Sequence, residues 1–139
     1  MNEITLQRLL IKKMEQIGGY GRKWASAFAV GLPDLILIRN GKSLYVEMKY
    51  IKSTSEVFRR KVDLTPKQTL ELNRIRDAGA KAVVAVVVDY MNDKYLLIMS
   101  PPAPQEVLHV SSDMVNPDGK SCSSWKNAGE LLEHMTKED

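Results

Sequence analysis

Residues 33–49, which read PDLILIRNGKSLYVEMK, decide the fold that we expect for this chain. Two apolar runs at 35–38 and 44–46 flank Asn40-Gly41. Asn-Gly between such runs is the strongest short-range signal for a β-hairpin, because a type I′ turn needs a positive φ at both central residues. We therefore predict a hairpin with a two-residue turn.

The turn fixes which side chains face each other. If Asn40 and Gly41 form it, the numbers of opposed residues sum to 81, and Asp34 lies opposite Glu47. Directly opposed side chains share a face of the sheet, with Cβ atoms about 4.5–5.5 Å apart. Lys49 follows two residues after Glu47 and points to the same face. Two carboxylates and a lysine at a strand end predict a divalent-cation site with a positive charge beside it.

Two other interpretations of these residues stay open. An ordinary hairpin with charged ends would contain the same residues, and a three-residue loop would place Asp34 opposite Met48 instead. A chance Pro-Asp followed about a dozen residues later by Glu-x-Lys is expected in about one chain of this length in a hundred. The coincidence is rarer still if the motif must also straddle a hairpin.

Pro33-Asp34 followed by Glu47-x-Lys49 resembles the signature of the PD-(D/E)xK nuclease superfamily. The layout resembles the small stand-alone VRR-NUC nucleases of phages and bacteria, which are related to Holliday-junction resolvases. The resemblance covers residues 2–89, and its three-residue motif is moderately specific. It implies an α/β fold: an αβββαβ restriction-endonuclease-like core with a central mixed sheet flanked by helices. We expect this core in residues 1–99 and a C-terminal extension, packed on or extending it, in residues 100–139.

Composition is that of an ordinary soluble globular protein. The chain has 139 residues, 44% hydrophobic and 27% charged, which is enough for one domain with one core. The net charge of +3 is compatible with a polyanionic partner. The lone Cys122 excludes an internal disulfide framework and a cysteine-based zinc site. We find neither a signal peptide nor an apolar run near 18 residues, so we expect no membrane partner and a cytoplasmic location in a bacterial or phage-infected cell.

The first helix is expected over residues 2–17, with Asn2 as its N-cap. Leu6, Leu10 and Met14 form its core-facing stripe, and Glu3 falls on the same meridian, so Glu3 is predicted to point inward. The alternative is a solvent-exposed acid that favours the helix dipole in the first turn. The VRR-NUC resemblance implies a site glutamate near the start of this helix, and Glu3 is the residue that matches.

The remaining elements complete the order α-β-β-β-α-β-β. Residues 18–21 are expected to be a loop, and residues 24–30 a strand that leads into the hairpin. Residues 81–89 are a continuous apolar, β-branched run typical of a strand buried on both faces. One more strand is expected over residues 95–99, reached across a turn at Asn92-Asp93.

A second helix is predicted to begin after Thr65 and to end before Gly79. Thr65 is the N-cap, Pro66 is the first helical residue and Gln68 completes a capping box. The capping box is a sufficient structural explanation for Gln68. The VRR-NUC resemblance implies a glutamine near the metal site at this position, which requires that the backbone caps while the side chain points at the site.

Residues 50–63 form a basic connection that contains Lys52, Arg59, Arg60 and Lys61. Such a run fits a solvated loop, and it equally fits a segment that grips phosphates beside the site without reading base sequence.

After a boundary at residues 101–104, the tail carries a short helix around 128–134, and its two histidines are expected at the surface.

The resemblance implies a metal-dependent endodeoxyribonuclease that hydrolyses phosphodiester bonds in branched DNA, such as flaps or four-way junctions. It implies one or two Mg²⁺ or Mn²⁺ ions per site, a homodimer and no small-molecule cofactor. Oxygen ligands select such hard ions. Asp34 and Glu47 would be direct ligands and the Met48 backbone carbonyl a third, while Glu3 would serve a second ion or act through water. Lys49 would orient the attacking water.

Two other functional classes stay open beside this one. The first is a non-catalytic nucleic-acid-binding or inhibitor protein on the same fold. The second is an RNA-directed or restriction-type relative.

Overall fold

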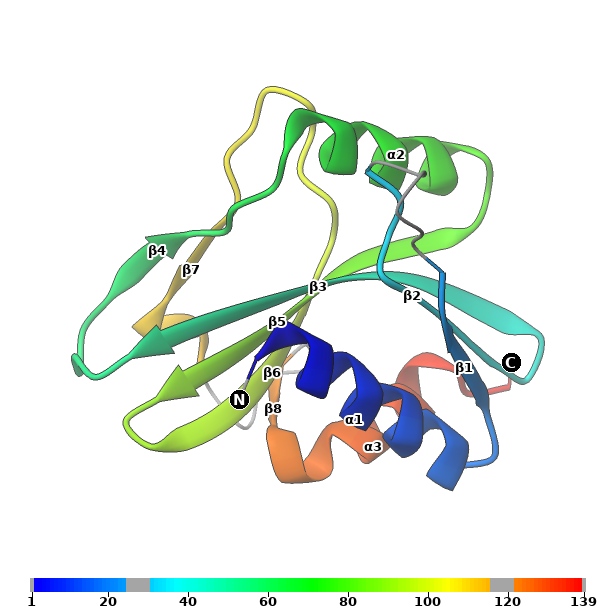
Figure 1. Ribbon diagram of the computed structural model, residues 1–139, viewed down its shortest axis with the longest axis horizontal. Coiled ribbons are helices and arrows are strands. Elements are labelled where there is room, and N and C mark those ends of the chain that lie inside the picture. Colours follow the sequence, from blue (N-terminus) through cyan, green and yellow to red (C-terminus); the bar gives the residue numbers. More distant parts are fainter. Residues whose placement is uncertain (1, 25–30, 116–121, 139) are drawn as a thin grey trace.

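The computed structural model describes residues 2–24, 31–115 and 122–138. These residues form three α-helices and eight strands (Figure 1). The helices are α1 (Glu3–Gln16), α2 (Pro66–Asp77) and α3 (Ala128–Met135). The strands are β1 (Tyr20–Lys23), β2 (Leu35–Arg39), β3 (Lys42–Ser53), β4 (Arg59–Lys61), β5 (Lys81–Tyr90), β6 (Asp93–Met99), β7 (His109–Ser111) and β8 (Cys122–Ser124). Two short 3₁₀ helices, η1 (Ser112–Met114) and η2 (Trp125–Asn127), complete the described chain.

Six strands form one mixed sheet in the order β1-β2-β3-β5-β6-β8. Only β3 and β5 run parallel, joined by the crossover through α2, and the other neighbours are antiparallel. Figure 1 shows α2 on one side of this sheet and α1 with α3 on the other. Strands β4 and β7 pair separately. The expected central mixed sheet flanked by helices is confirmed.

The predicted hairpin register is confirmed. Asn40 and Gly41 have φ values of 54° and 73°, as a type I′ turn requires. The β2–β3 ladder then runs from the pair Arg39–Lys42 to the pair Leu35–Val46. Continued by one residue, the same register places Asp34 opposite Glu47. The hairpin therefore brings the two acids to one face of the sheet.

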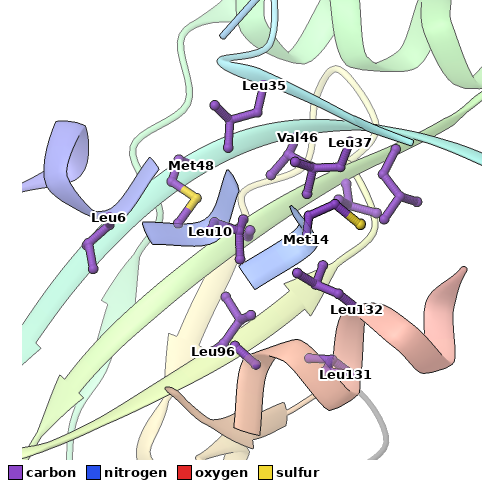
Figure 2. Packing of buried hydrophobic residues seen from close by; sticks show 14 of the residues in the cluster. Leu6, Leu10, Met14, Leu35, Leu37, Val46, Met48, Leu96, Leu131 and Leu132 are labelled. Atoms are coloured by element: carbon purple, nitrogen blue, oxygen red, sulfur yellow. The ribbon is translucent and has the colours of Figure 1, made fainter. Parts of the chain in front are cut away.

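The lower face of the sheet in Figure 1 holds the larger hydrophobic core (Figure 2). The stripe of α1 predicted from the sequence, Leu6, Leu10 and Met14, is completely buried there. It packs with alternate side chains of β2 and β3, and with Leu132 of α3. These contacts fix the side of β3 that faces α1, so the intervening residues of β3 point to the other side.

The opposite face is covered by α2 and by the segment around β4 and β7. Leu72 of α2 is buried against the β5 side chains Val84 and Val86. The predicted capping box is present, and α2 ends before Gly79, whose φ of +100° closes the helix. This local chemistry sets where the first turn of α2 stands above the sheet.

Three expectations about element boundaries were wrong. Strand β1 begins at Tyr20, inside the expected loop, and Trp24 follows it outside any strand, while residues 25–30 lie outside the described residues. The expected connection 50–63 begins as the end of β3 and includes β4, which pairs with β7. The β5–β6 turn has its positive φ values at Met91 and Asn92, one residue earlier than expected.

The C-terminal residues complete the architecture. Strand β8 pairs with β6, and α3 packs on the α1 side of the sheet. The side-chain amide of Asn40 donates to the carbonyl of Thr136 at 2.9 Å, so the last residues contact the hairpin turn. His109 is half-buried in β7 and His134 is exposed. No helix within the described ranges is long and apolar enough to cross a membrane.

Candidate active site

Asp34 and Glu47 meet at the end of β2 where the hairpin strands enter the sheet. Their pair belongs to the set of opposed pairs that do not exchange backbone hydrogen bonds, in which side chains approach most closely. Glu47 has only 3% of its side chain exposed, while Asp34 is half-buried. One acid is therefore held in the protein interior and the other at its border.

Asp34 is held by the backbone of the facing strand. Its Oδ2 accepts a hydrogen bond from the Met48 N–H at 2.8 Å. In the register of the ladder, Met48 stands opposite Pro33, and it directs both its N–H and its C=O toward β2. Pro33 has no N–H to donate to that carbonyl. The Asp34 side chain thus accepts the hydrogen bond of the Met48 N–H. Any residue other than proline at position 33 would donate its backbone N–H to the Met48 carbonyl, and Pro33 cannot.

Glu47 carries the largest electrostatic anomaly of the site. Burial is the first cause that raises its pKa, and the negative charge of Asp34 is the second, whereas Lys49 lowers it; together they raise the pKa of Glu47 to about 8. Its Oε1 atom is buried and has no hydrogen-bond partner among the described residues. When Glu47 is ionised, a buried carboxylate oxygen without a donor is costly, so this atom is suited to a cation.

Lys49 and Gln68 surround the other oxygen of Glu47. The Lys49 ammonium lies 3.6 Å from Glu47 Oε2, and the Gln68 amide nitrogen donates to the same oxygen at 3.3 Å. Lys49 also donates to Gln68 Oε1 at 3.4 Å. The three side chains form a closed triangle in which each contacts the other two.

Gln68 caps α2 and contacts the site with the same side chain. The side-chain Oε1 of Gln68 accepts from the Thr65 backbone N–H at 3.0 Å, and the backbone N–H of Gln68 donates to Thr65 Oγ1 at 3.1 Å. The expectation that only the backbone could cap while the side chain turned to the site was too narrow, because an amide oxygen has two lone pairs and accepts from Thr65 and Lys49 together. The start of α2 is therefore coupled directly to the acids.

The donor set fits a hard divalent cation. Two carboxylates, an orphaned buried oxygen and a backbone carbonyl are oxygen ligands, which Mg²⁺ and Mn²⁺ prefer, and Mg²⁺ keeps several waters, so few protein ligands are enough. No group of three or more His, Cys, Asp or Glu side chains with metal-binding geometry occurs within the described ranges. An ion here would rest on Asp34, Glu47 and the Met48 carbonyl.

Among the described residues, no hydrogen bond or ion pair joins Glu3 to these acids. Glu3 is exposed, so the prediction that it points inward was wrong. The buried stripe of α1 starts at Leu6, one turn later, and α1 packs on the face of β3 opposite to Glu47. An exposed acid in the first turn, stabilised by the helix dipole, is the alternative that the structure supports.

The four basic residues predicted to grip phosphates are all exposed, but they do not form one surface. Lys52 lies on the face of β3 opposite to Lys49, since the two are an odd number of residues apart. Arg59 and Lys61 point to one side of β4 and Arg60 to the other. Strand β4 itself stands on the α2 side of the sheet, as the acids do (Figure 1).

Sequence reasoning missed Trp24. The β1–β2 ladder pairs Lys23 with Leu35, and the Trp24 N–H donates to the Asp34 carbonyl at 2.9 Å. Trp24, which follows β1, Asp34, which precedes β2, and Glu47 of β3 therefore lie side by side in the continued register of these strands. The signal was present only in the pairing of β1 with β2, which no local motif encodes.

The structure is similar to that of Hjc, a Holliday junction resolvase from the archaeal hyperthermophile Archaeoglobus fulgidus. The TM-score is 0.55 and the identity 14%, over 80% of this chain and 84% of the resolvase. A structure described as a VRR_NUC domain is also similar, with a TM-score of 0.44 and 27% identity over 64% of this chain and 85% of that one. The sequence matches no model of a known protein family and no curated protein. The similarity to Hjc confirms the restriction-endonuclease-like fold.

Proposed function

We propose that this protein is a Mg²⁺- or Mn²⁺-dependent endonuclease that hydrolyses phosphodiester bonds in branched DNA. The observation that carries the proposal is the pair of opposed acids, Asp34 and Glu47. One oxygen of Glu47 has no hydrogen-bond partner among the described residues, and Lys49 and Gln68 contact the other oxygen. The motif and the fold agree with this chemistry. The preference for branched DNA rests on the resemblance of the motif and its surroundings to VRR-NUC nucleases.

Each residue has a separate task in this proposal. Asp34, Glu47 and the Met48 carbonyl would hold the ion, which when bound stabilises charge on the phosphoryl oxygens and makes water a better nucleophile. The Lys49 ammonium would orient the attacking water by hydrogen bonding and offset the negative charge that develops during attack. Glu3 lies outside this set of residues.

Gln68 acts in this proposal as a positioning residue. Its amide nitrogen donates to Glu47 Oε2 and its oxygen accepts from Lys49, so it fixes the relative orientation of a ligand and of the water-orienting ammonium. Residues that orient metal ligands typically contribute 10- to 100-fold to affinity or activity. Its role differs from that of Thr65, which contacts only the cap.

Gln68→Ala is expected to lower kcat about 10- to 100-fold with little change in KM, because the ligand and the ammonium lose their common partner. Thr65→Ala is the matched control: it removes the cap at a cost of about 1 kcal/mol in stability and leaves kcat unchanged where the protein is folded. Urea denaturation and steady-state cleavage of a labelled flap measure both effects. Equal losses of kcat in the two variants would show that Gln68 matters only as a cap.

Arg59 and Lys61, which point to the same side of β4, are proposed to contact DNA phosphates without reading sequence. Replacing both by Ala should lower the slope of log affinity against log salt by about 2, since each phosphate contact on duplex DNA contributes about 0.9. Fluorescence anisotropy with a labelled duplex at several salt concentrations measures the slope. The variant with Lys12→Ala and Lys126→Ala, which removes two exposed lysines on the α1 side, is the control. An unchanged slope in the variant of Arg59 and Lys61 would assign this side of β4 no role in binding.

The direct test of the proposed function is cleavage of labelled flap, four-way junction, linear duplex and RNA substrates with Mg²⁺ or Mn²⁺. Cleavage of the branched DNAs in preference to the others is the expected result. Binding without cleavage under either metal would favour the non-catalytic alternative. Two copies related by a two-fold axis would suit a symmetric junction, and sedimentation with and without a junction measures that stoichiometry.

A further inference from the structure

One side of the edge strand β1 carries a row of aromatic and cationic side chains. Tyr20 and Arg22 alternate along the strand and share a face, and Trp24 continues their spacing. Gly21, between them, packs closely on Leu37 on the side that faces α1. The three side chains therefore point away from α1, toward the side of the sheet that holds Glu47.

The row ends beside the candidate site. Trp24 stands next to Asp34 in the β1–β2 register, and Asp34 stands next to Glu47 in the β2–β3 register. Since neighbouring strands lie about 4.8 Å apart, the backbone of Trp24 is about 10 Å from that of Glu47. That distance corresponds to about three nucleotides of a stacked DNA strand.

The rings in this row are paired but remain open to solvent. Trp24 packs on Tyr45 of β3 with ring centroids 5.0 Å apart and an angle of 58° between their planes. The Arg22 guanidinium lies 4.3 Å from the centre of the Tyr20 ring. Trp24 is 40% exposed and Tyr20 49% exposed. Neighbouring side chains thus fix the orientation of both rings while leaving much of each accessible.

The chemistry of this surface selects its occupant. Exposed aromatic rings beside an arginine are what proteins use to bind unpaired nucleotides, because bases stack on rings of any kind and the guanidinium contacts phosphate. Strand β1 reads YGRK and carries positive charge with no acid to repel phosphates. Next to Trp24 lie the two acids that would hold the ion at the site of cleavage.

We propose that Tyr20, Arg22 and Trp24 form a platform on which unpaired nucleotides of the substrate stack next to the scissile phosphodiester. This inference rests on the proposed nuclease function and adds the part of the substrate that is recognised: a single-stranded segment, such as the flap or the opened arm of a junction. The platform gives selectivity for branched over linear duplex DNA without any contact to base edges.

The first experiment uses the two tryptophans as reporters. Trp125 is half-buried in η2, with the Lys13 ammonium 5.3 Å from its ring. Trp125→Phe leaves Trp24 as the sole tryptophan, and Trp24→Phe leaves Trp125. In EDTA, oligothymidylate is expected to quench the fluorescence of the first variant saturably and to leave that of the second unchanged. Absence of quenching in the first variant would overturn the platform.

The second experiment measures affinity by anisotropy in EDTA. Trp24→Ala should weaken binding of a single-stranded oligonucleotide about tenfold, Trp24→Phe should keep affinity within about threefold, and both should bind linear duplex as the wild type does. Circular dichroism and thermal melting confirm that both variants fold. Equal affinity of Trp24→Ala and wild type for the single strand would overturn the proposal. If Trp24→Ala changed only the oligomeric state measured by sedimentation, the surface would be a protein interface and the proposal would also fail.

These readings separate the platform from the nuclease. Both experiments run without metal, so quenching and tryptophan-dependent affinity support the platform even if no substrate is cut with Mg²⁺ or Mn²⁺, in which case the nuclease proposal fails alone. Conversely, efficient cleavage together with unchanged affinity of Trp24→Ala would retain the nuclease and remove the platform.

Discussion

Asp34→Asn is expected to reduce cleavage of branched DNA at least about a thousandfold while leaving the fold intact. An asparagine oxygen can still accept from the Met48 N–H, which the aspartate does at 2.8 Å, so the end of the hairpin keeps its contact. The negative charge that would hold the cation is lost, and charge stabilisation by a metal ion amounts to several kcal/mol of the barrier. Initial rates on a labelled flap with Mg²⁺ and with Mn²⁺ measure the effect.

The control for this substitution is Asp77→Asn. Asp77 ends α2, has 76% of its side chain exposed and makes only a weak ion pair with Arg76, so its removal should leave the rate unchanged. Lys49→Ala should resemble Asp34→Asn in rate, because it removes the ammonium beside Glu47. If Asp34→Asn or Lys49→Ala cut DNA as fast as the wild type, the chemistry would have to lie elsewhere in the chain.

Glu47→Gln is expected to abolish cleavage and yet to stabilise the metal-free protein at alkaline pH. Burial and Asp34 raise the pKa of Glu47 from 4.5 to about 8. Below 4.5 the glutamate is protonated in both the folded and the unfolded chain. Between 4.5 and about 8 the folded chain retains a proton that the unfolded chain has released, so the stability of the wild type falls as pH rises.

The size of this loss follows from the same shift. The difference between 4.5 and about 8 corresponds to about 5 kcal/mol as an upper limit, reached once the pH passes the folded-state pKa. Glutamine does not ionise, so the variant escapes the loss. Urea denaturation in EDTA should find the two proteins similar near pH 4.5 and the variant increasingly the more stable up to pH 9. Parallel stability profiles would show that Glu47 is not strained by its burial.

Addition of Mg²⁺ should reverse the order of stability. A ligand that binds only the folded protein stabilises it by an amount set by the ratio of its concentration to its Kd, and Glu47→Gln lacks the charged ligand. Wild-type protein at pH 8 should therefore gain stability with Mg²⁺ while the variant should not. Equal gains in both proteins would place the ion away from Glu47.

The parts of this structure that could be predicted from sequence depend on local chemistry. Asn40-Gly41 fixed the hairpin register because few residues tolerate positive φ, and the register alone brought Asp34 opposite Glu47. The capping box of α2 depends on residues three positions apart, so it was predicted as well. In both cases the information lies within a few residues of the feature.

The parts that could not be predicted depend on pairing between distant segments. Strand β1 reads YGRK, without apolar alternation, and exists because it pairs with β2. The polar β4 exists because it pairs with β7. Helical periodicity placed Glu3 on the buried side of α1, but periodicity does not show which turns of the helix the sheet covers. The buried residues of α1 begin only at Leu6. Trp24 was missed for the same reason as β1.

The contact between Asn40 and Thr136 places the C-terminal end of the described chain against the hairpin turn. The acids lie five residue pairs away along the ladder, about 17 Å at the usual rise of a strand. A bulky group attached at the C-terminal end of the described chain would therefore press on the Asn40-Gly41 turn. The β2–β3 ladder would transmit the displacement to the distance between Asp34 and Glu47.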